Sequence, residues 1–240
     1  MNTHTALLST QSDATLYLAE QLRQGEWFKQ LHVDFQHELL QHAICKKLKR
    51  DEYLFQQHHA FNGLYCLISG SVLINHYHKQ GKESLLMILT PGHWFGEISL
   101  IDGLNCTHNA VTKTDVEVVW IPAAAMQAIL LRHPIFWRDI ACLSVQRLRC
   151  AFIELHESSV LPTFQRVVRR LISINQFQQQ PGQRAILTLR QEHLANMLGI
   201  SRQTINQILK ELEALKLIQL SYRSIEILNF AALAQLTEQP

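Results

Sequence analysis

The stretch that decides the fold is residues 190–213, which read RQEHLANMLGISRQTINQILKELE. Apolar side chains recur at helical spacing on both sides of Gly199, which predicts two amphipathic helices. Glycine can take the positive φ that ends a helix, and Ser201 can accept a hydrogen bond from the free N–H groups that begin the next helix. Together these features predict a helix-turn-helix, with an ordinary helical hairpin as the alternative.

The second predicted helix carries a polar face that suits DNA. We predict that its outward side chains pair with base edges in a major groove, and these are Arg202, Gln203, Asn206 and Gln207. Contacts with phosphates position a protein without specifying sequence, and the candidates for them are Ser201, Thr204, Lys210 and Arg223.

A β-hairpin is predicted after this helix. Residues 217–220 and 225–228 form two short apolar runs on either side of Tyr222 and Arg223, and residues 185–189 form a further strand before the first helix. The hairpin would be a wing, so we expect a winged helix-turn-helix.

Composition is that of an ordinary globular chain with an uneven distribution of charge. The 240 residues include 22 Lys and Arg against 20 Asp and Glu; residues 161–240 contain nine basic and five acidic side chains. This basic C-terminal part suits a nucleic-acid partner.

The five cysteines lack a Cys-x-x-Cys pair, and we expect a reduced, cytoplasmic protein without a membrane span.

The remaining chain divides into a strand-rich and a helical part. Residues 16–42 predict short lead-in helices, and residues 46–121 alternate apolar and polar residues in short runs typical of a β-barrel or sandwich. Residues 123–131 and 134–159 predict helices. We expect three domains: an effector domain over 1–133, a dimerisation helix over 134–161, and a DNA-binding domain over 162–240.

The longer helix has an apolar seam with alternating steps of four and three residues. Its members are Ala141, Val145, Leu148, Phe152 and Leu155. Such a seam predicts a homodimer with two reading heads for a palindromic operator, or else a face that packs on the barrel of the same chain.

Read together, these segments resemble the cyclic-AMP receptor protein/FNR (CRP/FNR) family of bacterial transcription regulators. The motifs are GLYCLISGSV at 63–72, GHWFGE at 92–97 followed by Asp102-Gly103, and GISRQT at 199–204. The resemblance implies an α+β fold with an N-terminal double-stranded β-roll (a jelly roll like that of cyclic-nucleotide-binding domains), a long dimerisation helix and a winged helix-turn-helix. It implies a sequence-specific, homodimeric DNA-binding regulator, not an enzyme, with RNA polymerase as a further candidate partner.

The departures from the family concern the effector. The resemblance places an effector pocket at Gly96, Glu97, Thr107, His108, Ala151 and Phe152. Family members that bind cyclic AMP hold its phosphate with an Arg-Ser pair where this chain has Thr107-His108, and they touch the purine with hydroxyls where it has Ala151-Phe152. We therefore predict that cyclic AMP is not the effector, which stays unidentified, and we predict no cofactor. An iron–sulfur cluster is not expected because residues 1–44 contain no cysteine.

Alternatives remain open. His76, His78 and Glu83 resemble the first metal motif of cupins, which leaves a metal-dependent enzyme, or a regulator holding a metal or haem in its roll, as minor hypotheses. The second cupin motif is missing, so we predict no metal site. A third hypothesis is an adaptor whose winged helix contacts protein instead of DNA.

Overall fold

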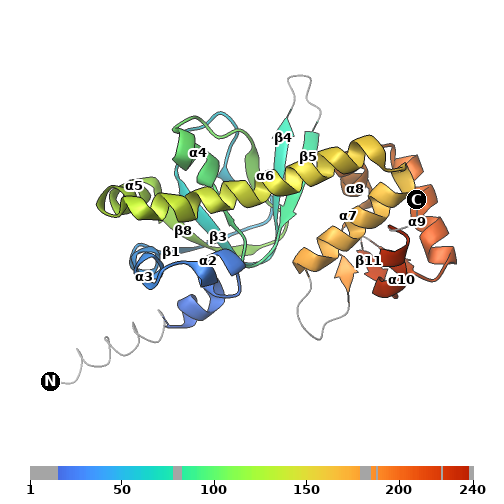
Figure 1. Ribbon diagram of the computed structural model, residues 1–240, viewed down its shortest axis with the longest axis horizontal. Helices are drawn as coiled ribbons and strands as arrows, with labels where there is room; N and C mark the ends of the chain where they lie inside the picture. The colour runs from blue at the N-terminus through green and yellow to red at the C-terminus, as the bar shows by residue number, and fades with distance from the viewer. Residues whose placement is uncertain (1–15, 78–82, 179–184, 188, 223, 238–240) are drawn as a thin grey trace. The chain divides into compact units, whose positions relative to one another are not determined.

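A computed structural model describes residues 16–77, 83–178, 185–187, 189–222 and 224–237 (Figure 1). The chain divides into two compact units, residues 1–149 and 150–240, and the boundary falls inside one long helix, α6 (Trp137–Val160). The predicted three-domain division stays a prediction.

The first unit is a roll of two four-stranded antiparallel sheets. One sheet has the order β1-β8-β3-β6 and the other β2-β7-β4-β5. The strands are β1 (Ile44–Leu48), β2 (Tyr53–Phe55), β3 (Gly63–Ser69), β4 (Val72–Tyr77), β5 (Glu83–Leu89), β6 (Trp94–Phe95), β7 (Asn109–Thr112) and β8 (Val116–Pro122). The prediction that residues 46–121 form many short strands is therefore confirmed.

Two apolar cores hold the roll together. One lies between the sheets, where Phe55, Tyr65 and Phe95 pack with aliphatic side chains. The other lies between the β1–β8–β3–β6 sheet and the helices around it. Those helices are residues 16–22, α2 (Glu26–Gln30), α3 (Val33–Gln41), α5 (Ala123–Arg132), the 3₁₀ turn η1 (Pro134–Phe136) and the start of α6. The predicted lead-in helices thus complete the core of the roll.

Helix α6 has two different faces. Ile140 and Leu143 are buried in the second core, whereas the predicted seam residues lie in solvent in the single chain. Val145, Leu148, Phe152 and Leu155 are all exposed, and Phe152 and Leu155 retain 61% and 64% of their accessible surface. The face that packs on the roll is therefore not the face of the seam.

The second unit begins with the last turns of α6 and is a winged helix-turn-helix. Its elements are α7 (Thr163–Gln178), β9 (Ile186–Leu187), α8 (Gln191–Leu198), α9 (Arg202–Ala214), β10 (Ile218–Ser221), β11 (Ser224–Ile227) and α10 (Phe230–Gln235). The strands form a small sheet in the order β10-β11-β9. Two ion pairs, Arg169 with Glu157 and Arg170 with Glu154, join α7 to the end of α6.

Candidate functional site

The turn between α8 and α9 has the geometry that the sequence predicts. Gly199 ends α8 in the left-handed region with a φ of 65°. Ser201 caps α9, because its hydroxyl accepts the N–H of Thr204 at 3.0 Å. The apolar faces meet through buried Leu194, Ile205 and other side chains. The turn, the cap and the buried apolar faces therefore all favour the same arrangement of α8 and α9.

The predicted reading residues do not all lie in the same environment. Arg202, Gln203, Gln207 and the predicted phosphate contact Lys210 are exposed on α9. Asn206 is only partly exposed, and its Nδ2 donates a hydrogen bond to Oε1 of Gln191, the first residue of α8, at 3.0 Å. The start of α8 thus packs beside Asn206, whose role in base reading stays a prediction.

Two other predicted phosphate contacts, Ser201 and Thr204, lie at the start of α9. Ser201 is exposed and Thr204 half-buried, and their hydroxyl oxygens are 2.8 Å apart. Tyr222 lies at the wing turn with 85% of its surface exposed. Arg223, its neighbour, falls outside the described residues.

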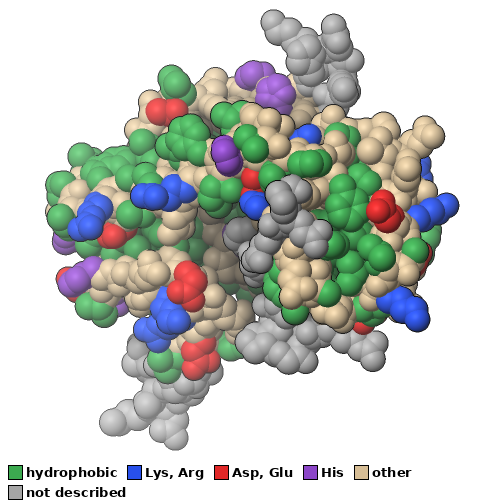
Figure 2. All heavy atoms as spheres, turned by 45° about the vertical axis from the view of Figure 1, so that its right-hand side comes forward, with side chains coloured by type: hydrophobic (Ala, Val, Ile, Leu, Met, Phe, Trp, Pro, Cys, Tyr) green, Lys and Arg blue, Asp and Glu red, His purple; other side chains and the backbone are tan. Residues whose placement is uncertain are grey.

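Basic side chains are not concentrated on the face drawn in Figure 2. Lysines and arginines there are scattered among polar, apolar and acidic side chains.

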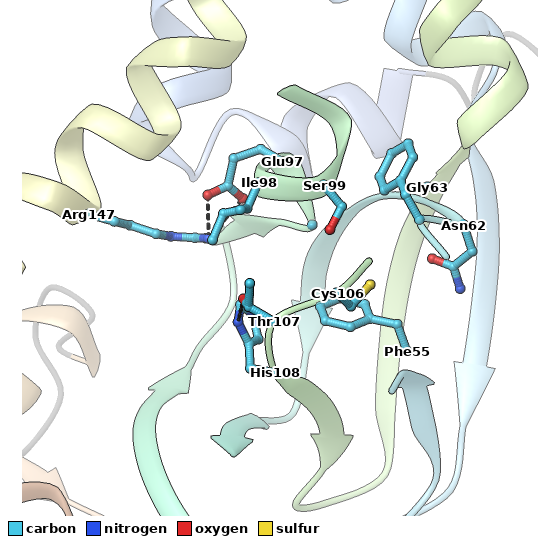
Figure 3. A pocket seen from close by; sticks show the side chains of 12 residues that line it. Phe55, Asn62, Gly63, Glu97, Ile98, Ser99, Cys106, Thr107, His108 and Arg147 are labelled. Carbon is cyan, nitrogen blue, oxygen red and sulfur yellow. Dashed lines mark hydrogen bonds and ion pairs between the residues drawn. The ribbon is translucent and has the colours of Figure 1, made fainter. Parts of the chain in front are cut away.

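A second candidate site is a small pocket in the roll (Figure 3). It lies between α4 (Glu97–Asp102) and the segment before β7, and it encloses about 10 Å³, space for about one water molecule. Of the six predicted effector residues, four line it: Gly96, Glu97, Thr107 and His108. The pocket is thus where the resemblance places it, but side chains fill it.

Arg147 of α6 occupies the side of this pocket next to Glu97 (Figure 3). Its Nη1 donates to both carboxylate oxygens of Glu97, at 2.7 and 2.8 Å, and its Nη2 donates to the carbonyl oxygen of Trp94. The Glu97 side chain is fully buried, whereas 25% of the Arg147 side chain is exposed. A buried carboxylate needs such a partner, because desolvation without one is costly.

Arg147 is not among the effector residues predicted from the sequence. The available signal was its spacing, since Arg147 follows the buried residues Ile140 and Leu143 by seven and four positions and shares their helix face.

Gly96, which precedes Glu97, has a φ of 101°, and a Cβ there would lie 2.8 Å from the carbonyl oxygen of Gly63. Glycine is therefore required for the turn that aims Glu97 inward.

Thr107 and His108 supply no fixed positive charge to the pocket. The Thr107 hydroxyl oxygen lies 2.8 Å from Nδ1 of His108. Burial, followed by the positive charge of Arg147 and by His76, lowers the pKa of His108 to about 4. The imidazole is thus neutral at physiological pH. The two remaining predicted effector residues, Ala151 and Phe152, belong to the second unit and have exposed side chains.

The possible metal motif gains no support from the described residues. Nε2 of His76 lies 2.8 Å from the amide nitrogen of Gln57. His78 falls outside the described residues, as does the side chain of Glu83. Within the described part of the chain, no group of three or more His, Cys, Asp or Glu side chains is arranged to hold a metal ion. None of the helices described there is long and apolar enough to cross a bilayer.

Comparisons with known proteins agree with both halves of the fold. Residues 45–133 match the family model of the cyclic nucleotide-binding domain, and residues 165–236 match that of the Crp-like helix-turn-helix domain. The chain is 30% identical over 201 residues to a CRP-like cAMP-activated global transcriptional regulator of Mycobacterium tuberculosis, covering 80% of this chain and 90% of that protein. It is 29% identical over 183 residues to a cyclic AMP receptor protein of Thermus thermophilus, covering 76% and 83%.

The fold is also found in solved structures. That of FixK2 from Bradyrhizobium japonicum superposes with a TM-score of 0.72 at 18% identity, covering 81% of this chain and 96% of that one. A β-roll, a long helix and a winged helix-turn-helix together define a DNA-binding transcription regulator. The chain belongs to the CRP/FNR family of such regulators.

Proposed function

We propose that the chain acts as a homodimer that binds a palindromic operator through α8, α9 and the wing, and that it does not respond to cyclic AMP. The observation that carries the proposal is the capped turn at Ser201, which presents exposed Arg202, Gln203 and Gln207 on one side of α9. An Arg and two Gln side chains provide donors and acceptors for guanine and adenine edges. The proposed setting is the bacterial cytoplasm, with RNA polymerase as a further partner.

Sequence-specific binding is tested by selecting sites from random duplex DNA. A palindromic site should emerge, with half-sites about one helical turn apart. On that site Arg202→Ala should cost about 1–3 kcal/mol of binding free energy and leave binding to random DNA nearly unchanged, whereas Lys210→Ala should weaken both. Selection of no site, or a palindrome bound equally well by Arg202→Ala, would contradict the assignment.

The dimer is supported by the unpartnered seam of α6. Leu148 and its neighbours Val145, Phe152 and Leu155 leave a stripe of large apolar side chains in solvent, and a stripe of this kind marks an interaction surface. A second copy of the same helix offers the same a and d positions, so the two seams are complementary.

Charge placed in the seam tests this dimer. Leu148→Glu should produce a monomer in sedimentation equilibrium and abolish tight operator binding, because two carboxylates would face each other across the interface. Gln146→Glu adds the same charge at another exposed position of α6 and serves as the control. A Leu148→Glu protein that stays dimeric would contradict a dimer built on this seam.

Insensitivity to cyclic AMP is supported by the pocket of the roll. Ligand sites for molecules of drug size typically measure about 300–1,000 Å³, far more than the 10 Å³ enclosed beside Glu97. The guanidinium of Arg147 is already bonded to Glu97, and His108 is neutral, so the pocket offers no uncommitted cation for a cyclic phosphate. Either another effector or none is then used.

Titration calorimetry with cyclic AMP tests this point, in parallel with operator binding with and without the nucleotide. No heat of binding and no change in operator affinity are expected. A saturable 1:1 isotherm together with tighter operator binding would refute the proposal.

A further inference from the structure

A hydrogen bond joins the two helices of the reading head at its surface. Nδ2 of Asn206 on α9 donates to Oε1 of Gln191 on α8 at 3.0 Å, and both side chains are partly buried. Of the four predicted base-reading residues, all of them described, Asn206 is the half-buried one. Its carboxamide is thus held by the neighbouring helix before any DNA is present.

This bond leaves part of the carboxamide available for a base. An Asn side chain has two N–H donors and one carbonyl acceptor, and the bond to Gln191 engages one donor. The second N–H and Oδ1 remain, and these are the donor and the acceptor that N7 and N6 of adenine require. The contact with Gln191 is therefore compatible with adenine recognition.

The bond also selects which way the carboxamide faces. The terminal torsion of an Asn side chain is broad and roughly two-fold, so an unrestrained amide exchanges the places of its oxygen and its nitrogen. In the pair as the structure shows it, Nδ2 donates to the carbonyl oxygen of Gln191, so turning the Asn206 amide alone would place two carbonyl oxygens against each other. The partner on α8 thus stabilises one orientation of Asn206.

We propose that Gln191 is a positioning residue for base recognition, holding Asn206 in the orientation that reads an adenine in each half-site. The inference rests on the proposed DNA-binding function and adds a residue outside the recognition helix to the specificity determinants. The role assigned to Gln191 concerns only the base that Asn206 reads. It does not extend to the bases read by the exposed residues Arg202, Gln203 and Gln207.

The test is a panel of operators in which each base pair of the half-site is replaced in turn. Dissociation constants are measured by fluorescence anisotropy for the full-length wild type, Asn206→Ala, Gln191→Ala and the double variant. Asn206→Ala should reduce discrimination at one position by about 5- to 150-fold, the range of one bidentate base contact. Gln191→Ala should reduce discrimination at that same position and at no other, and should have no further effect in the Asn206→Ala background.

Two more variants separate positioning from other roles. Gln191→Glu keeps an oxygen acceptor for Asn206, so it should retain the base preference at that position while its added negative charge weakens binding to every operator alike. Asn196→Ala removes an exposed amide elsewhere on α8 and should leave the preference unchanged. Melting temperatures within a few degrees of wild type would show that each variant is folded.

Uniform weakening by Gln191→Ala on all operators, of equal size with and without Asn206, would show a phosphate contact and overturn the inference alone. An unchanged panel for Gln191→Ala would overturn it as well. A wild-type protein that prefers no sequence would overturn the proposed function first and the inference with it, so the two failures are distinguishable.

Discussion

Replacement of Arg147 by Met should destabilise the roll by about 3–4 kcal/mol. The substitution retains an apolar stem of similar length but removes the guanidinium, which leaves the Glu97 carboxylate fully buried without its partner. Breaking a buried ion pair in this way typically costs about 3–5 kcal/mol. The lower part of this range applies because Arg147 is 25% exposed and the gap that it leaves can admit water. For a unit of about 150 residues this corresponds to a fall in Tm of about 10 °C.

Tryptophan fluorescence provides an assay confined to the affected unit. All four tryptophans, Trp27, Trp94, Trp120 and Trp137, lie within residues 1–149. Urea unfolding followed by their emission therefore reports the roll without the winged helix, which avoids treating a two-unit chain as a single two-state system.

A double-mutant cycle isolates the ion pair from other effects of the substitution. Glu97→Gln keeps an acceptor for Arg147 and should cost only about 1–2 kcal/mol, because the arginine still reaches solvent. In that background Arg147→Met should cost about 1 kcal/mol, which gives a coupling energy of about 2–3 kcal/mol. If Arg147→Met costs less than 1 kcal/mol, or the same in both backgrounds, then the pair does not stabilise the roll and the reasoning is wrong.

Three further changes test other parts of the structure. Ser201→Ala removes the cap of α9 and should lower the free energy of unfolding of the winged helix by about 0.5–2 kcal/mol, measured by its loss of helical circular dichroism, with Ser201→Asn close to wild type. Burial lowers the pKa of His108 to about 4, so as the pH falls the unfolded chain binds a proton before the folded chain does. The free energy of unfolding of the roll should therefore fall by up to about 3 kcal/mol between about pH 6.5 and pH 4. Urea unfolding of His108→Asn at a series of pH values should show a smaller dependence of this free energy on pH, and an equal dependence would contradict the prediction. Gly25→Ala would place a Cβ 2.2 Å from the carbonyl oxygen of Gly92, and we expect the free energy of unfolding of the roll to fall by about 1–3 kcal/mol in the same fluorescence assay. Gly103→Ala, where the space for a Cβ is open, is the control and measures the cost of the backbone conformation alone.

Local chemistry made much of the fold predictable from the sequence. The turn at Gly199 and the cap at Ser201 involve residues within a few positions of each other, so their geometry follows from sequence spacing. The strands of the roll follow from short apolar runs, as in β8, where Val116 and Val118 are buried in one core and Val119 and Ile121 in the other. Such signals need no knowledge of which segments meet in space.

Contacts between distant segments were not predictable in the same way. Glu97 and Arg147 are 50 positions apart, and the pair forms only because α6 turns the face of Ile140 and Leu143 to the roll. The sequence predicts Asn206 on the outward face because it is polar and lies outside the apolar stripe of α9. Its partial burial depends on where the first turn of α8 lies, which periodicity within α9 does not encode.

The ion pair of the pocket also limits what an effector could be. A ligand that takes Arg147 from Glu97 must offer the guanidinium an anion and must also give the buried carboxylate new hydrogen-bond donors. Without those donors the Glu97 carboxylate would stay buried and unpaired, as in Arg147→Met. The next residue of α6, Leu148, is exposed in the seam proposed for the dimer. A ligand that satisfied both charges would therefore bind beside the part of α6 that carries the proposed dimer seam. A ligand with only one of the two groups would gain one contact and lose another of similar strength, and it would be expected to bind weakly.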